Sequence, residues 1–221
     1  MNNYNSTIIL HAIDKSTLFL DKFKDEFSGV YKPFNMNEDS IKGIKTLLGD
    51  LEPKSLIVFL GHGSSSGLFE PDDTHTYEKY FLNVTLGNLY FDEHDIFLLS
   101  CKSNEYIQKI YKSNYSVGFG NIISSKTELD LHNQKSELEK GLSEEEIKTF
   151  NEIYVNSCIK VIKNIINGDI LFQDTPKYIA YYINKEINKI LLNKDNNNRI
   201  ELAKLLFEFR NQIQLKYNLR T

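Results

Sequence analysis

The sequence has 221 residues, of which 41% are hydrophobic and 25% charged, and this is enough apolar material for the core of a globular domain. The net charge is −4 and only Arg199, Arg210 and Arg220 are arginines, which argues against nucleic acid as the main partner. The two cysteines, Cys101 and Cys158, are far apart in the sequence, which excludes a disulfide framework and a zinc cluster from our expectations.

The N-terminal residues give no sign of targeting to a membrane. Residues 1–7 lack a basic segment followed by a long apolar one. No apolar run in the sequence approaches the ~18 residues that span a bilayer. We therefore expect a cytoplasmic protein without a membrane partner, in which any functional cysteine acts as a single thiol.

The first 60 residues predict strands that alternate with helices. The expected strands are residues 7–13, 30–34 and 55–60. Pro33 places the second of them at an edge of the sheet, because proline cannot donate a ladder hydrogen bond. The first helix follows a cap at Asp14 or Ser16, and the second follows a cap at Asn37. This order predicts a parallel sheet with right-handed crossovers.

The middle of the chain is less regular. Residues 64–95 contain glycines, prolines and several aromatics, which is typical of an elaborated loop with a hairpin or a short helix. The apolar run at residues 96–100 predicts a second fully buried strand. Residues 105–112 predict a helix, residues 115–123 another strand, and the polar residues 124–141 a mobile loop.

The rest of the chain predicts helices. Ser143 and Glu146 form a capping-box pattern ahead of an apolar face that ends at Gly168. Thr175 and Pro176 are typical of the start of a second helix. A third helix is expected from Arg199 to about Tyr217.

Two of the predicted strands end in a reactive side chain. Residues 55–60 lead to His62, and residues 96–100 lead to Cys101. The carboxyl ends of parallel strands lie at one edge of a sheet, so an imidazole and a thiol could meet there. A thiol attacks a carbonyl as the thiolate, and it needs a base and donors for the oxyanion that forms. His62 is the candidate base, and the backbone amides of Gly63 and Cys101 are the candidate oxyanion hole.

The spacing of these features resembles that of the caspase-like cysteine peptidases of clan CD, and more narrowly that of the CHAT domain. The matching blocks are Leu60-Gly61-His62-Gly63-Ser64, Leu98-Leu99-Ser100-Cys101-Lys102-Ser103 and Val117-Gly118-Phe119. The resemblance extends over residues 7–192. It implies an α/β caspase-like three-layer sandwich with a central, mainly parallel sheet in residues 1–192. Residues 193–221 would then be a C-terminal helix packed on this domain or extending from it.

The resemblance also implies an activity. Cys101 would form the acyl-enzyme, and His62 would polarise the scissile carbonyl or accept the thiol proton, without a cofactor or a metal. The expected partners are a protein or peptide substrate and an activating or regulatory protein, and several bacterial members belong to antiviral or other defence systems. The family's first specificity pocket lies beside the strand after the cysteine. Glu128 and Asp130 follow this strand and could select a basic substrate residue, with a solvated loop as the simpler alternative.

Several other hypotheses stay open. His62 and Cys101 could be a satisfied strand-end histidine and a small buried hydrophobe. A catalytically inactive caspase-like adaptor is suggested by Asn104, where CHAT sequences often carry glycine, and by an apolar helix face that could bind a partner. That face comprises Ile200, Leu205, Leu206, Phe209 and Ile213. Residues 61–67 could instead be the phosphate loop of a flavodoxin-like domain, and residues 92–95 resemble metal ligands but fit a solvated turn.

Overall fold

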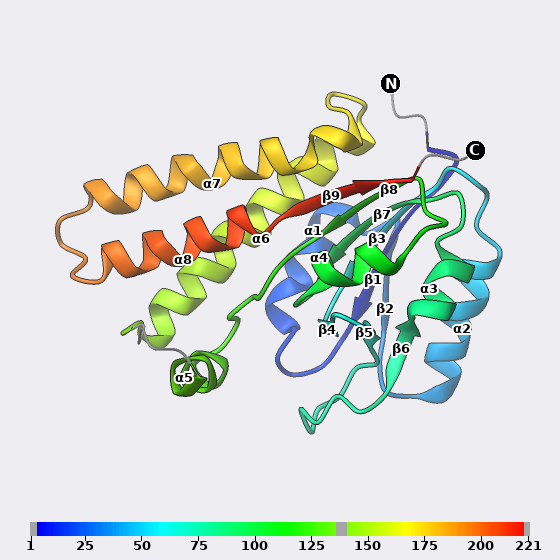
Figure 1. The fold of residues 1–221 in the computed structure, drawn as a ribbon, viewed down its shortest axis with the longest axis horizontal. Coiled ribbons are helices and arrows are strands. Elements are labelled where there is room, and N and C mark those ends of the chain that lie inside the picture. The colour runs from blue at the N-terminus through cyan, green and yellow to red at the C-terminus, as the bar shows by residue number, and fades with distance from the viewer. Residues whose placement is uncertain (1–3, 136–140, 219–221) are drawn as a thin grey trace.

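The structure is a computed structural model that describes residues 4–135 and 141–218. Within these residues the chain has a mixed α/β fold whose central, mostly parallel sheet has the strand order β2-β1-β3-β7-β8-β9 (Figure 1). The strands are β1 (Thr7–Ala12), β2 (Tyr31–Phe34), β3 (Leu56–Leu60), β7 (Asp95–Leu99), β8 (Tyr115–Gly118) and β9 (Gln214–Tyr217). β9 alone in this sheet runs antiparallel to its neighbour.

The strands that lead to His62 and Cys101 are neighbours, as the sequence predicts. β3 pairs with β7 in parallel, and Leu60 lies opposite Leu99. Both strands therefore end at the same level of the sheet, and each reactive residue follows its strand by two positions. The prediction for Pro33 is also confirmed, because it lies on the edge strand β2.

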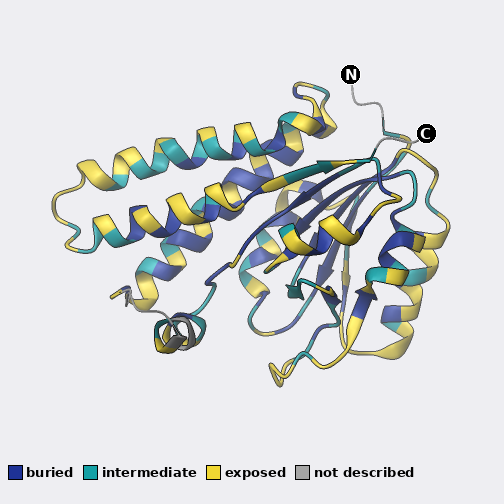
Figure 2. Ribbon diagram, viewed as in Figure 1, coloured by how far each residue is buried: buried dark blue, intermediate teal, exposed yellow. Residues whose placement is uncertain are grey.

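Helices cover both faces of the sheet (Figures 1 and 2). One face packs on α2 (Glu38–Gly49), α3 (Val84–Tyr90) and α4 (Ser103–Tyr106). The other packs on α1 (Lys22–Phe27), α6 (Glu144–Ile166), α7 (Thr175–Leu192) and α8 (Arg199–Asn211). Ile57 and Phe59 belong to the first core, and Val58 and Leu60 to the second. This double burial explains the lack of polar alternation in the strands.

A small antiparallel sheet follows His62. It consists of β4 (Gly63–Ser64), β5 (Gly67–Phe69) and β6 (Tyr80–Asn83), and the helix α3 comes directly after it. The predicted loop with a hairpin or a short helix thus contains both. The chain also contains the short 3-10 helices η1 (Leu18–Asp21), η2 (Ile107–Lys109) and η3 (Phe172–Asp174).

Two of the predicted helix caps are confirmed, but the cap expected at Asp14 or Ser16 is not, because η1 has Thr17 at its N-cap without a side-chain cap hydrogen bond. The Asn37 side chain accepts a hydrogen bond from the Asp39 amide, and Ser143 and Glu146 form the predicted capping box of α6. The helix expected at residues 105–112 is shorter and consists of α4 continued by η2. In the described parts of the chain, none of the helices combines the length and the hydropathy that a transmembrane span requires.

The prediction of a loop at residues 124–141 is wrong in its first part. Residues Lys126–Lys135 form the helix α5, and residues 136–140 lie outside the described part of the chain. The Ser125 side chain accepts a hydrogen bond from the Glu128 amide in the first turn, and Leu129 is fully buried. Most residues of this helix are polar, which produces almost no amphipathic period, so the helix leaves little trace in the sequence.

The predicted end of the last helix is also wrong. α8 ends at Asn211, and the residues after it form the edge strand β9 on β8. Except for Ile200, the residues of the proposed docking face are buried against the chain's own core; these are Leu205, Leu206, Phe209 and Ile213. Phe209 stacks on Phe119 and Tyr154. This face is therefore internal and does not offer a free docking surface.

Candidate functional site

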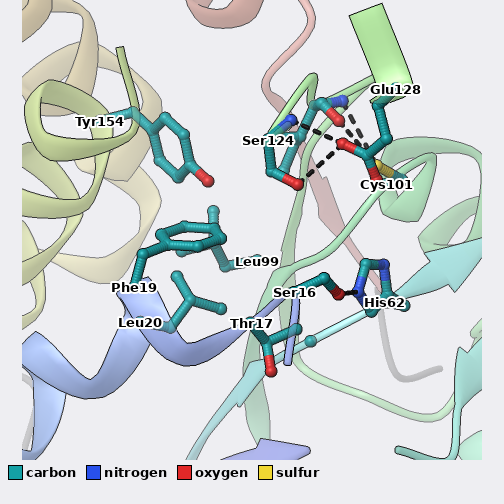
Figure 3. A pocket seen from close by; sticks show the side chains of 12 residues that line it. Ser16, Thr17, Phe19, Leu20, His62, Leu99, Cys101, Ser124, Glu128 and Tyr154 are labelled. Atoms are coloured by element: carbon teal, nitrogen blue, oxygen red, sulfur yellow. Dashed lines mark hydrogen bonds between the residues drawn. The ribbon is translucent and has the colours of Figure 1, made fainter. Parts of the chain in front are cut away.

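His62 and Cys101 line one pocket at the carboxyl edge of β3 and β7 (Figure 3). The other walls come from the segment after β1, from Ile122 to Glu128, and from Tyr154 of α6. The cavity volume is about 20 Å³, which is room for about one water molecule. The structure thus brings the two predicted residues to one small pocket.

Close backbone packing explains the two glycines that flank His62. Gly61 has φ +153°, and a Cβ there would lie 2.9 Å from the Ala12 side chain. A Cβ on Gly63 would lie 2.7 Å from Oγ of Ser100 and 3.2 Å from the carbonyl oxygen of Cys101. The Gly-His-Gly segment therefore passes close to the end of β1 and lies directly on the turn that carries the cysteine.

Ser103 stabilises the turn after Cys101. Its Oγ donates a hydrogen bond to the Ser100 carbonyl at 2.8 Å and accepts one from the Phe119 amide at 2.8 Å. Lys102 adopts a left-handed conformation with φ 55°. Asn104, the position that suggests an inactive adaptor, donates to the Gln212 carbonyl at 3.1 Å and so attaches the segment after α8. Asn104 thus has a structural role of its own.

The Cys101 thiol is held in a neutral form. Its Sγ donates to the Ile122 carbonyl at 3.2 Å, and the Ile122 amide donates to Sγ at 3.4 Å. Part of the residue is exposed, but burial of the thiol among the pocket walls raises its pKa to about 12, and the negative charge of Glu128 contributes to this rise. The thiolate is therefore scarce at neutral pH in this conformation.

The imidazole of His62 has partners that the sequence analysis missed. Its Nε2 lies 2.6 Å from Oγ of Ser16 and 3.6 Å from Oδ2 of Asp14. The ring of Tyr77 lies on the imidazole with the centroids 4.3 Å apart. Asp14 was expected only as a helix cap, and it does accept the amides of Ser16 and Thr17. Its position at the end of β1, beside β3, is the signal that could have placed it near His62.

Asp14 is a buried carboxylate, and its side chain is only 1% exposed. Burial alone would raise its pKa, but the nearby His62 ring and the hydrogen bonds from Ser16 outweigh this effect and bring the pKa down to about 2. Oδ1 of Asp14 accepts the hydroxyl of Ser16 at 2.6 Å. The pocket therefore holds a fixed negative charge next to the histidine at neutral pH.

The variant Asp14→Asn should reduce the acid sensitivity of the fold. The pKa of Asp14 is lower in the folded state, about 2, than the ordinary value of 3.8, so the carboxylate stabilises the fold above about pH 4 and this contribution disappears as the pH falls through 2. This shift of the Asp14 pKa corresponds to a contribution of about 2 kcal/mol to the free energy of unfolding at neutral pH. Urea unfolding between pH 5 and 2 should show a difference between wild type and variant that shrinks on acidification. Asp50→Asn, at an exposed aspartate at the end of α2, is the control, and a pH-independent difference for Asp14→Asn would contradict this expectation.

Of the two predicted specificity residues, only Glu128 reaches the pocket. Its Oε2 accepts the amide of Ser124 at 2.6 Å and the Ser124 hydroxyl at 2.7 Å, which places the carboxylate beside Cys101 (Figure 3). Asp130 is exposed outside this pocket and forms an ion pair with Lys126 at 3.0 Å. The two carboxylates lie on α5 rather than in a solvated loop.

The variant Glu128→Gln should make Cys101 more reactive. Removal of the negative charge lowers the pKa of the thiol, and each unit of the decrease gives about ten times more thiolate at pH 8. Gln keeps an oxygen that can accept from Ser124. The measurement is the rate of alkylation of Cys101 by iodoacetamide, followed by mass spectrometry. Asp130→Asn on the same helix is the matched control, and equal rates in the two variants would show that the Glu128 charge does not act on the thiol.

The alternative sites have other roles. Residues 61–67 enter the β4–β5 hairpin and not a helix, so they lack the geometry of a phosphate loop. Nδ1 of His94 accepts the Ser55 amide at 3.2 Å, and Asp95 accepts the hydroxyl of Tyr4 at 2.7 Å. Among the residues that the structure describes, no group of three or more His, Cys, Asp or Glu side chains could hold a metal ion.

The site therefore combines a thiol, an imidazole with a buried carboxylate behind it, and a second carboxylate beside the thiol. Such a set can transfer a proton and form a covalent bond to a carbonyl carbon. No family model matches the chain, and neither a curated protein nor a solved structure matches it.

Proposed function

We propose that the protein is a caspase-like cysteine endopeptidase in which His62 and Cys101 act as a dyad. One observation carries the proposal: two neighbouring parallel strands end at one level and bring an imidazole and a thiol to the same pocket. In the first step the thiol proton passes to His62 and the sulfur attacks the scissile carbonyl carbon. The protonated ring then gives the proton to the leaving amine, and water hydrolyses the acyl-enzyme.

The local backbone supports the assignment of Gly63 to the oxyanion hole. The Phe69 amide donates to the His62 carbonyl at 3.0 Å, so His62 and Phe69 form a hydrogen-bonded pair of the antiparallel ladder. Gly63 lies opposite Leu68 in the next pair, which is of the non-hydrogen-bonded type. The amide of Gly63 therefore points away from β5 and is available for a developing oxyanion together with the amide of Cys101.

The small volume of the pocket supports a resting form that needs activation. A cavity of about 20 Å³ does not admit a peptide, and the thiol is neutral in it. Movement of Glu128 away from Cys101 would open the pocket and lower the pKa of the thiol at the same time. A regulatory protein or the substrate itself would stabilise the open form, and the Glu128 carboxylate would then be able to pair with a basic substrate side chain.

Reaction with a peptide electrophile tests the proposal. The protein is incubated with peptide chloromethyl ketones that carry arginine or alanine at the reacting position, and the adduct is located by peptide mapping. We expect an adduct on Cys101 and none in Cys101→Ala, with the buried Cys158 as an internal control. A wild-type protein and a Glu128→Gln variant that both stay unmodified at Cys101 would contradict a peptidase.

The second candidate is a catalytically inactive caspase-like adaptor that acts by binding a partner. The neutral, hydrogen-bonded thiol and the narrow pocket are the observations that favour it. An adaptor has no need of His62 for the reactivity of Cys101. Modification of Cys101 that proceeds equally well without the imidazole would therefore support the adaptor.

A further inference from the structure

We infer that Asp14 and Ser16 are positioning residues that hold His62 in the tautomer with its hydrogen on Nε2, so that Nδ1 is the nitrogen that receives the proton of Cys101. The hydrogen on Nε2 follows from the two hydrogen bonds of Ser16 beside an ionised Asp14, and its catalytic meaning rests on the proposed function. Neither residue touches the substrate in this arrangement. They act through the orientation and protonation of the imidazole.

The assignment follows from a count of hydrogens. Oγ of Ser16 lies 2.6 Å from Oδ1 of Asp14 and 2.6 Å from Nε2 of His62. A serine hydroxyl has one hydrogen, and an ionised carboxylate accepts only. The hydrogen of Ser16 is therefore directed to Asp14, and the lone pair of Ser16 accepts from Nε2–H of His62. In the opposite tautomer one of the two 2.6 Å contacts would bring two lone pairs together.

The surroundings of the ring maintain this orientation. Tyr77 lies on the imidazole at an interplanar angle of 34°, and its hydroxyl lies 3.3 Å from Oγ of Ser16. In Figure 3, Nε2 faces Ser16, whereas the other ring nitrogen lies on the side toward Glu128 and Cys101. The titratable groups around the imidazole and its pocket are Asp14, Tyr77, Cys101, Glu128 and Tyr154. The ring is thus fixed by contacts on one edge and one face, and its basic edge is directed into the pocket.

Asp14 has a second oxygen that is suited to the charged form of the ring. Among the described residues Oδ2 is buried and has no hydrogen-bond partner, and it lies 3.6 Å from Nε2 of His62. A proton transferred from Cys101 to Nδ1 makes the ring an imidazolium. The nearby carboxylate stabilises this cation, and the proton itself stays on the imidazole.

The tautomer can be measured directly by long-range ¹H–¹⁵N NMR of the uniformly labelled protein at a pH where His62 is neutral. The signals of His62 are identified by their loss in His62→Ala. We expect the Nε2–H tautomer in the wild type and in Ser16→Thr, and a mixture of the two tautomers in Ser16→Ala and in Asp14→Asn. Asn retains the oxygen that accepts the amides of Ser16 and Thr17, so the turn is preserved. A remote serine variant, Ser40→Ala, should leave the wild-type tautomer.

A kinetic readout separates this inference from the proposed function. Ser16→Ala should slow labelling of Cys101 by the peptide chloromethyl ketone at least about tenfold, and Ser16→Thr should keep most of the wild-type rate. In serine peptidases a wrong tautomer of the catalytic histidine lowers the catalytic rate about 10⁴-fold. An Nδ1–H tautomer in the wild type, or an unchanged tautomer in both Ser16→Ala and Asp14→Asn, would overturn the inference even if Cys101 is labelled. If the tautomers are as expected but Cys101 is not labelled, the positioning of His62 is supported and only the proposal of a peptidase is contradicted.

Discussion

Replacement of Phe209 by alanine should lower the free energy of unfolding by about 3–5 kcal/mol, because it removes a large side chain from the interior and leaves a cavity. Phe209 is 3% exposed, and its ring centroid lies 4.8 Å from that of Tyr154 and 5.4 Å from that of Phe119. Urea unfolding monitored by circular dichroism measures the change. The transition should remain a single one, because α8 is part of the same core as α6.

The same helix provides the control for this experiment. Phe207 lies two positions before Phe209 and is 47% exposed. The guanidinium carbon of Arg210 lies 4.5 Å from the centroid of its ring. Phe207→Ala should lower the free energy of unfolding by less than about 1 kcal/mol, because an exposed cation–π pair contributes about 0.5–1 kcal/mol. Equal and small effects at both positions would mean that α8 is an appendage. That result would restore the hypothesis of a C-terminal docking helix.

Replacement of His62 by alanine should slow the reaction of Cys101 with a peptide chloromethyl ketone by about 100-fold or more at pH 7, the usual contribution of a general base. Without the imidazole the thiol has to ionise against the burial that raises its pKa to about 12. The rate is followed by the mass of the Cys101 adduct. Unfolding by urea, measured in parallel, shows whether the variant keeps its fold.

His75→Ala is the matched histidine control. His75 is exposed in the segment between β5 and β6, and its Nδ1 lies 3.1 Å from the hydroxyl of Tyr77. It contacts Tyr77 and does not line the pocket of Cys101. We expect its rate to stay within about twofold of the wild type. If His62→Ala and His75→Ala react at the same rate as the wild type, the thiol does not depend on an imidazole, and the adaptor is the better description.

The two carboxylates of the pocket should have opposite effects on the proposed activity. Glu128 lines the pocket and contributes to the raised pKa of Cys101, whereas Asp14 holds a negative charge behind His62. The two carboxylates thus lie on opposite partners of the dyad. Removal of the Glu128 charge should increase the reactivity of the thiol, and removal of the Asp14 charge should decrease it. Opposite signs from two carboxylates of one pocket are a strong test of this geometry.

Most of the sheet could be predicted from the sequence, because a strand buried on both faces has to be apolar along its whole length. β3 and β7 are such strands, and their parallel pairing placed His62 and Cys101 at one edge. The capping residues Asn37 and Ser143 were equally readable, since a cap depends on bonds to residues two or three positions away.

Long-range contacts account for what the sequence did not reveal. α5 is a polar helix held by Leu129 and the contact of Glu128 with Ser124, and the strand β9 requires β8 as a partner. The apolar residues of α8 have the same pattern whether they face a partner or their own core. Phe209 is buried because Phe119 and Tyr154, about 90 and 55 residues earlier in the sequence, complete its surroundings.

The sequence by itself determined the parallel strands, the caps at Asn37 and Ser143 and the placement of His62 and Cys101 at one edge of the sheet, because these depend on local periodicity and on the rule that parallel strands end together. Only the tertiary structure decided the electrostatics of the pocket. Asp14 and Ser16 reach His62 from a different strand end, and Glu128 reaches Cys101 from a helix. Burial and distance set the charge of each group, and neither quantity is encoded by neighbours in the sequence.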